Sequence, residues 1–324
     1  MSLGTPRRLG RALAGLALAL AAGLGTAQPA TDCPPAAQPP TAEQVSQGMR
    51  QARDRGFLWR IEKDGRRSHL YGTLHVARHE WMFPGPKVVA ALRASDVIAL
   101  EIDLLDAEQQ RRLAAAMAAE GTRPMPAALR ERLARLAERE CLEWQRVEGL
   151  APESQVAVLT AMTARRDGLD PAYGIDLVLA GLGRGMRTPV VSLETPEIQA
   201  AALRSPDPAG RDTAIANSLD ALETGRARPM MQRMAQVWAD ADHDALANFH
   251  TWCECLRDDT ERAAMKRLLD DRHPGIVEAI DALHRGGQRV FAAVGSLHFT
   301  GAQALQVLLA RRGYRVERIV LSPP

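Results

Sequence analysis

Two copies of one short sequence motif contain the residues best suited to chemistry. The motifs are Gly72-Thr73-Leu74-His75 and Gly295-Ser296-Leu297-His298, and each follows an apolar run typical of a strand. Glycine permits a sharp turn and the close approach of another group. Histidine at such a turn can serve as a metal ligand or a general base. The motifs therefore make His75 and His298 candidate catalytic residues, with Gly72, Thr73, Gly295 and Ser296 in supporting roles.

An acidic strand end lies between the two motifs in the sequence. Glu101-Ile102-Asp103 closes the apolar run Val97–Ile102, which predicts a buried strand. Alternation along a strand would place Glu101 and Asp103 on the same face. Two histidines and one carboxylate form a known catalytic metal shell that leaves a position open for water. We therefore predict a divalent metal (Mn, Co or Zn) on His75, His298 and Glu101, although a histidine–glutamate pair could also act without a metal.

Each of these signals also has a simpler interpretation. A single Gly-x-x-His motif often holds a hydrogen-bonded structural histidine, and an acidic strand end can cap the following helix. Asp176 opens a predicted helix and could merely complement its positive start. Glu194 could point into the site or pair with an arginine. The repetition of the motif around an acidic strand end favours one shared site over these separate explanations.

The elements that must position these residues predict an α/β fold with a mixed central sheet flanked by helices and a large helical middle region. A hairpin is predicted across Asp64-Gly65, because alternating residues flank this turn signal. Helical periodicity dominates from Asp106 to about His284. Further strands are expected over Pro189–Leu193, Arg289–Val294 and Tyr314–Val320, the last two joined by a helix over Ala302–Arg311 that suits a parallel crossover.

The first residues are typical of a secretory signal peptide. Arg7, Arg8 and Arg11 precede the apolar run Leu13–Leu20, and Gly25-Thr26-Ala27 suits a cleavage site. We therefore predict a signal peptide over residues 1–27, a disordered leader over 28–44 and a single domain over 45–324. The mature protein would be periplasmic or secreted, and no later apolar run is long enough to predict a stable membrane span.

Composition and charge narrow the class of partner. The chain has 324 residues, 46% of them hydrophobic and 25% charged, which is ordinary for a globular protein. Without the three arginines of residues 1–27, the 41 basic and 39 acidic residues become 38 and 39, a net charge of −1. Nothing in this balance favours nucleic acid as a partner. The oligomeric state is not specified by the sequence.

The four cysteines are candidates for disulfides in an exported protein. Cys253 and Cys255 are too close to pair readily on a helix, so one could bridge to Cys141 and the other to Cys33. The sequence does not decide the connectivity.

The order of the motifs resembles the TraB/GumN family over roughly residues 45–320. The resemblance rests on the two Gly-x-x-His motifs, supported by Leu100–Asp103, Gly174–Asp176 and Leu193–Thr195. The family is related to TIKI metalloproteases and to erythromycin-esterase-like and ChaN-like proteins. The resemblance implies that His75, His298 and Glu101 share one cleft, with Asp103, Asp176 and Glu194 as further candidates. One departure is Arg272-His273, where we expect Arg-Asn in relatives.

This resemblance favours a metal-dependent, peptidase-like hydrolase that acts on a peptide or small ester. Bound water would be the nucleophile, and Asp103 or Glu194 would accept its proton or support the ligands. A metal-free esterase with His75 as the base is one alternative. A non-catalytic protein that binds haem, iron or a peptide is another.

Overall fold

The structure is a computed structural model, and it describes residues 33–321. Its centre is a six-stranded sheet in the order β4-β3-β5-β2-β1-β6. The strands are β1 (Phe57–Lys63), β2 (Arg66–Thr73), β3 (Val97–Leu100), β4 (Val190–Ser192), β5 (Val290–Gly295) and β6 (Arg315–Ile319). Neighbouring strands run parallel, except that β1 is antiparallel to both β2 and β6. The predicted α/β class with a mixed sheet is confirmed.

The hairpin forms where the turn signal predicts it. Asp64 and Gly65 both have positive φ values, 51° and 71°, which a two-residue hairpin turn requires. The strands on either side pair from Phe57 with Gly72 to Lys63 with Arg66. The pairing sets the register of β2 and therefore the place where the first Gly-x-x-His motif leaves the sheet.

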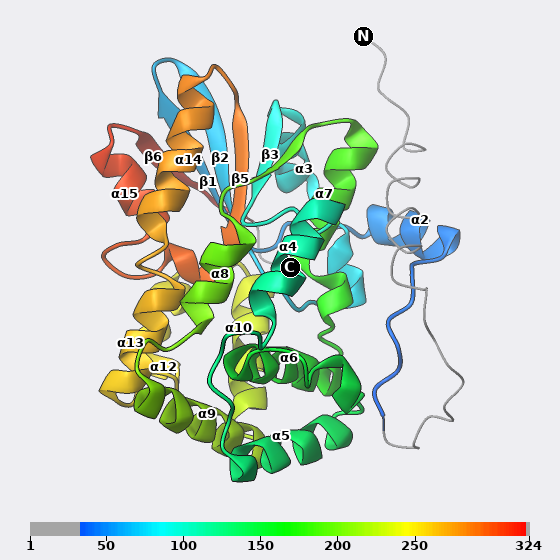
Figure 1. The fold of residues 1–324 in the computed structure, drawn as a ribbon. Coiled ribbons are helices and arrows are strands. Elements are labelled where there is room, and N and C mark those ends of the chain that lie inside the picture. Colours follow the sequence, from blue (N-terminus) through cyan, green and yellow to red (C-terminus); the bar gives the residue numbers. More distant parts are fainter. Residues whose placement is uncertain (1–32, 322–324) are drawn as a thin grey trace.

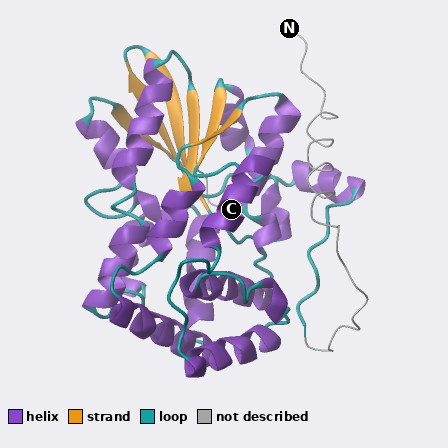
Figure 2. Ribbon diagram, in the orientation of Figure 1, coloured by secondary structure: helices purple, strands orange, loops and turns teal. Residues whose placement is uncertain are grey.

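Helices make up most of the rest of the chain. They are α2 (Ala42–Arg50), α3 (Pro86–Arg93), α4 (Ala107–Met117), α5 (Ala127–Arg139), α6 (Pro152–Thr163), α7 (Ile175–Met186), α8 (Pro196–Leu203), α9 (Pro208–Glu223), α10 (Ala227–Ala239), α11 (His243–Ala247), α12 (Phe249–Trp252), α13 (Asp259–Leu268), α14 (His273–Arg285) and α15 (Leu305–Arg311). The sheet lies at one end of the molecule, and α5, α6 and α9 lie at the other (Figures 1 and 2).

The apolar residues form two separate clusters that match this division. The larger cluster surrounds the sheet and includes fully buried Phe57, Leu70 and Phe291. The smaller cluster joins α5, α6 and α9 through residues such as Leu133 and Leu219. The helical middle region therefore has its own small core, and the predicted sites lie between this region and the strands.

Three expectations about chain organisation need correction or fall outside the structure. The predicted signal peptide lies outside the described residues. Residues 33–44 of the predicted disordered leader are instead held in place, because Cys33 is bonded to Cys141 and α2 begins at Ala42 behind a Thr41 cap. The predicted strand Val97–Ile102 ends at Leu100. Within residues 33–321, no helix is long and apolar enough to cross a membrane.

The structure settles a disulfide pairing that the sequence left open, and it is not the one considered there. Cys33 pairs with Cys141, and Cys253 pairs with Cys255. The expectation of a continuous helix around Cys253 argued against the second pair. In the structure α12 ends at Trp252 and the backbone of Cys253 is extended, so the two nearby cysteines can face each other across a turn.

Candidate functional site

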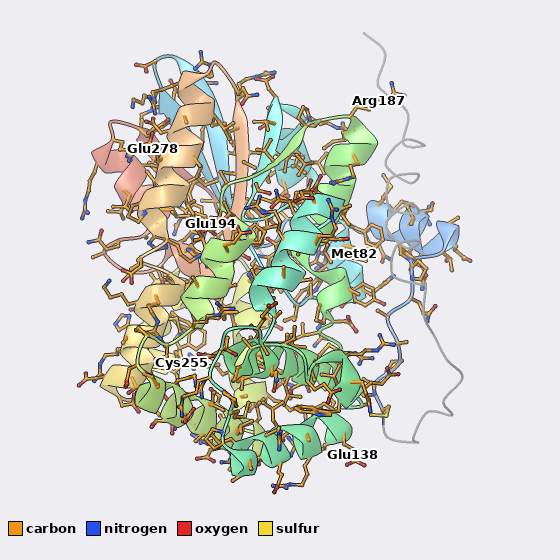
Figure 3. The ribbon with its side chains drawn as sticks, viewed as in Figure 1. Met82, Glu138, Arg187, Glu194, Cys255 and Glu278 are labelled. Carbon is orange, nitrogen blue, oxygen red and sulfur yellow. A yellow bond between two sulfur atoms is a disulfide. The ribbon has the colours of Figure 1, made fainter. Side chains whose placement is uncertain are left out.

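The carboxyl ends of four parallel strands bring the predicted site residues to one edge of the sheet. β5 lies between β2 and β3, and β4 lies beyond β3. Residues Thr73 and Gly295 are register partners, so the two Gly-x-x-His motifs leave the sheet side by side. Glu101 follows β3 and Glu194 follows β4, where the labelled Glu194 can be seen beside α8 (Figure 3). Carboxyl edges of parallel strands are where such sheets place their ligands.

The glycine of the first motif allows the two motifs to approach each other. A side chain at Gly72 would lie 2.9 Å from the Ser296 hydroxyl, so no larger residue fits without a shift. Ser296 Oγ donates to the Thr73 carbonyl at 2.8 Å. The indole of Trp238 donates to the Gly72 carbonyl at 2.7 Å. Ser296 therefore joins the two motifs rather than pointing into the site.

His75 is oriented by the start of α7. Its Nδ1 lies 2.8 Å from Oδ2 of Asp176, whose other oxygen accepts from the Thr73 hydroxyl at 2.7 Å. Gly174 lets α7 begin this close, because a side chain there would come within 2.7 Å of the His75 carbonyl. The Asp176 charge, with a smaller contribution from Glu101, raises the pKa of His75 to about 9.

The ring of His75 is the part of the site that solvent reaches. Its side chain is 68% exposed, whereas the side chains of Glu101 and Asp176 are nearly buried. Nε2 of His75 lies 4.0 Å from Oε1 of Glu101. A substrate arriving from solvent would therefore meet His75 first.

Glu101 lies at the centre of the site. Its Oε1 accepts from the backbone amide of Gly295 at 2.7 Å, and its Oε2 accepts from Gln199 Nε2 at 3.0 Å and from Arg272 Nη2. Burial alone would raise the pKa of this carboxyl. The positive charges of His75 and Arg272 and the Gly295 amide outweigh burial and lower the pKa to about 2. Glu101 is therefore ionised at neutral pH.

Arg272 bridges the two buried carboxylates of the site. Nη2 donates to both Glu101 and Glu194, and Nε donates to Glu194 Oε1 at 3.0 Å. Burial raises the pKa of Glu194, against the attraction of Arg272. Glu194 therefore pairs with an arginine, as the simpler interpretation of this residue holds. The same guanidinium also binds Glu101, so the two carboxylates share one cation.

His298 is buried and held at both ring nitrogens. Nε2 lies 3.2 Å from Arg272 Nη1 and 3.9 Å from Glu101 Oε2. Nδ1 lies 2.9 Å from Nε2 of His273. Burial, reinforced by Arg272 and the neighbouring histidines, lowers the pKa of His298 to about 3, so the ring is neutral at physiological pH.

A small space remains between the three residues predicted to hold a metal. A methyl group built on Gly295 would meet Glu101 Oε1 at 3.2 Å, His75 Nε2 at 3.5 Å and His298 Cδ2 at 3.7 Å. The gaps of 4.0 and 3.9 Å between the Nε2 atoms and Glu101 are too long for hydrogen bonds. They are also wider than the roughly 3.3 Å that separates two ligands of a tetrahedral ion with bonds of about 2 Å, so the side chains would have to move closer to bind one. No preformed cluster of three or more His, Cys, Asp or Glu ligands exists among the described residues.

Asp103 lies in a separate network. Its Oδ2 accepts from Arg184 at 2.9 Å, and its Oδ1 accepts from the Leu105 amide at 3.1 Å. Because β3 ends at Leu100, strand alternation does not extend to Asp103, and the shared face predicted for Glu101 and Asp103 does not form. Asp103 fastens α7 to the end of β3 instead.

Sequence reasoning gave no role to three residues that contact the site. Gln199 comes from the first turns of α8, and Arg272 and His273 come from the start of α14. The only available signal was the unusual Arg-His pair at 272–273. His284 has a structural role away from the site, because its ring contacts Ser68 Oγ at 3.1 Å and the Lys63 carbonyl at 3.0 Å.

Fold and site together define an α/β domain with a histidine–carboxylate centre at the carboxyl edge of its parallel strands. The model of the TraB/PrgY/gumN family matches residues 57–318, which is most of the chain. The protein belongs to this family. No curated protein and no solved structure gives a significant match to the chain.

Proposed function

We propose that this protein is an exported hydrolase that cleaves an acyl bond in a peptide or small ester at the centre formed by His75, Glu101 and His298. The observation that carries the proposal is the convergence of two imidazole Nε2 atoms on one ionised carboxylate, with a small space in front of Gly295 between them. Neutral imidazole and carboxylate are common ligands of catalytic divalent metals.

The donor set fits a divalent ion on His75, His298 and Glu101. Each histidine has its Nδ1 engaged, by Asp176 or by His273, and turns Nε2 towards Glu101. Such outer hydrogen bonds orient metal-binding imidazoles. The ion would supply a Lewis acid and a nucleophile derived from its bound water at neutral pH. Binding would require Arg272 to release His298 Nε2 and one oxygen of Glu101.

The chain's own residues supply position and proton transfer. Asp176 holds the His75 ring, and Thr73 holds Asp176, so the exposed imidazole faces an incoming substrate in one orientation. Glu194 is the carboxylate that would accept a proton, because burial raises its pKa above the ordinary value even though Arg272 pairs with it. Arg272 stands beside both buried carboxylates and can stabilise negative charge that develops there.

A metal-free esterase is the second candidate, and the position of Arg272 favours it. The guanidinium already provides a cation between Glu101, Glu194 and His298. His75 would then be the base. Because Asp176 raises the pKa of His75 to about 9, this mechanism predicts activity that increases as the pH rises through that value.

Elemental analysis of purified protein tests the first candidate. We expect about one Mn, Co or Zn ion per chain after incubation with the metal and gel filtration, and the ion should be lost in both His75→Ala and His298→Ala. His250→Ala, an exposed histidine on α12, is the control for adventitious surface binding. Hydrolysis of peptide and ester libraries is then measured with and without a chelator. Binding that is absent from wild type under all three metals would overturn the metal site.

The pattern of turnover separates the remaining possibilities. Chelator-resistant hydrolysis that His75→Ala abolishes would support the metal-free esterase. Tight ligand binding without turnover would point to the haem-, iron- or peptide-binding alternative. Two disulfides in the structure support export, since disulfides persist in oxidising compartments. Amino-terminal sequencing of protein recovered from the periplasm should find a chain that begins near Gln28.

A further inference from the structure

Two consecutive residues at the start of α14 hold opposite nitrogens of His298. Nη1 of Arg272 lies 3.2 Å from His298 Nε2, and Nε2 of His273 lies 2.9 Å from His298 Nδ1. α14 begins at His273, with Arg272 as its cap residue. The start of α14 therefore contacts both nitrogens of the His298 ring, which lies in the segment after β5.

The chemistry of Arg272 decides where the proton of His298 lies. A guanidinium has only donors, so it can contact the lone pair of a ring nitrogen but not another N–H group. His298 Nε2 must therefore be the acceptor, and the proton of the neutral ring lies on Nδ1. The opposite tautomer would direct an N–H group at the guanidinium and would leave two lone pairs facing each other between His298 and His273.

His273 is placed to accept that proton. Its side chain is 0% exposed, and its Nε2 is the atom that faces His298 Nδ1. The proton of His273 must then lie on its own Nδ1. On that side Nδ1 has no hydrogen-bond partner among the described residues, and Oδ1 of Asp270 lies 3.8 Å away, too far for a hydrogen bond but close enough for its charge to favour a proton there. The contact between the two rings is therefore satisfied by this assignment, while the outer nitrogen of His273 carries an N–H group without such a partner.

We propose that His273 is a positioning residue that fixes His298 as the Nδ1–H tautomer and so keeps a lone pair on its Nε2, which Arg272 contacts in this structure. A lone pair on Nε2 is what a metal ligand or a proton acceptor at that position requires. The consequence for metal binding rests on the proposed function, whereas the tautomer itself can be tested in metal-free protein.

The first test measures the wild-type protein, and a variant serves only to assign its signals. Two-bond ¹⁵N–¹H correlation spectra of ¹⁵N-histidine-labelled, metal-free protein report which ring nitrogen carries the proton. The His298 signals, assigned by their loss in His298→Gln, should show a protonated Nδ1 and an unprotonated Nε2. A wild-type His298 ring protonated on Nε2 would overturn the proposal.

Substitutions then test the part played by His273. In His273→Gln the side-chain carbonyl can still accept the Nδ1 proton, so the wild-type tautomer should persist. In His273→Leu no acceptor remains, and we expect a mixture of tautomers. His284→Leu is the matched control, because it removes another buried, doubly hydrogen-bonded histidine of α14 far from the site. A single wild-type tautomer in folded His273→Leu would contradict the proposal.

Metal titration distinguishes this proposal from the proposed function. With Mn²⁺ or Zn²⁺ as the probe, loss of an orienting partner should weaken binding by about 10- to 100-fold in His273→Leu, and much less in His273→Gln and His284→Leu. If wild type binds neither ion but shows the expected tautomer, and His273→Leu disturbs it, the metal site fails and the positioning role stands. Equal metal affinity in wild type and the three variants would show that His273 does not orient His298 for metal binding.

Discussion

Nδ1 of His75 and Oδ2 of Asp176 lie 2.8 Å apart, although the two residues are 101 positions apart in the sequence. The contact joins the end of β2 to the first turn of α7. Asp176 is itself held by the Thr73 hydroxyl, so the carboxylate cannot turn away without losing a second hydrogen bond. The exposed ring of His75 is consequently fixed by buried partners, as a reactive group open to substrate needs to be.

Substitution of Asp176 should move the pKa of His75 back towards its ordinary value. The attraction of the Asp176 carboxylate is the main cause of the rise to about 9, and Asn keeps the shape without the charge. An NMR titration of metal-free Asp176→Asn should therefore show His75 titrating well below its wild-type midpoint. Glu197→Gln, which removes an exposed carboxylate paired with Arg112, is the control. An unchanged His75 midpoint in Asp176→Asn would exclude Asp176 as the cause.

The same shift makes the contribution of His75 to stability depend on pH. A group whose folded-state pKa is raised stabilises the protein below its unfolded pKa, here 6.5, and loses this effect as the pH rises through about 9. His75→Gln should therefore lower the free energy of unfolding more at pH 6 than at pH 10. Urea titrations of chelator-treated wild type and variant at the two pH values measure this difference. The prediction fails if the two losses are equal.

Gly295→Ala should impair the site more than the fold. The added methyl would come within 3.2 Å of Glu101 Oε1 and 3.5 Å of His75 Nε2, in the space between the proposed ligands. We expect a loss of at least tenfold in metal affinity or in turnover, with a small change in melting temperature. Gly149→Ala is the matched control, since a methyl there meets nothing within 4 Å. Full activity in Gly295→Ala would show that this space is not used.

Part of this site could be predicted from the sequence because its signals are local. The hairpin turn at Asp64-Gly65 marks where β2 begins, and the glycines of the two motifs mark where β2 and β5 end. Those strand ends place His75 and His298. Glu101 follows a short apolar run and is equally readable. Asp103 was placed on the same face by strand alternation, which failed because the strand stops at Leu100.

The rest depends on packing between distant segments. Arg272 reaches Glu101 across 171 residues of sequence, and His273 reaches His298 only because α14 packs against β5. No periodicity or turn signal in residues 270–275 specifies which strand end the start of α14 will face. An arginine was one of two interpretations that the sequence left open for Glu194, and the particular arginine and its second carboxylate could not be identified.

Removal of Arg272 should destabilise the protein strongly. It is 10% exposed and pairs with two nearly buried carboxylates, so Arg272→Met would leave both without their cation. Breaking a buried pair in this way costs about 3–5 kcal/mol. Arg112→Met is the control: it breaks a bidentate pair with Glu197 on the surface, which is worth about 0–1 kcal/mol. Equal losses in urea unfolding would contradict the buried bridge.

The two disulfides should differ in their effect on stability. The Cys33–Cys141 bond closes a loop across 108 positions, whereas Cys253 and Cys255 are separated by 2. In the chain-entropy model the long loop is worth about 4–5 kcal/mol and the short one about 1–2 kcal/mol. The long bond also helps to hold residues 33–41, whose Gln38 backbone amide donates to the Tyr173 hydroxyl at 2.9 Å, two residues before Ile175 begins α7.

Paired Cys→Ser variants measured by urea unfolding under oxidising conditions test this ordering. Cys33→Ser with Cys141→Ser should lose several kcal/mol, and Cys253→Ser with Cys255→Ser should lose much less. The first variant should keep the pKa of His75 near its wild-type value, because Asp176 is held by Thr73 rather than by the amino-terminal segment. A larger loss from the short disulfide would mean that the turn after α12 contributes more to the stability of the helical region than loop closure accounts for.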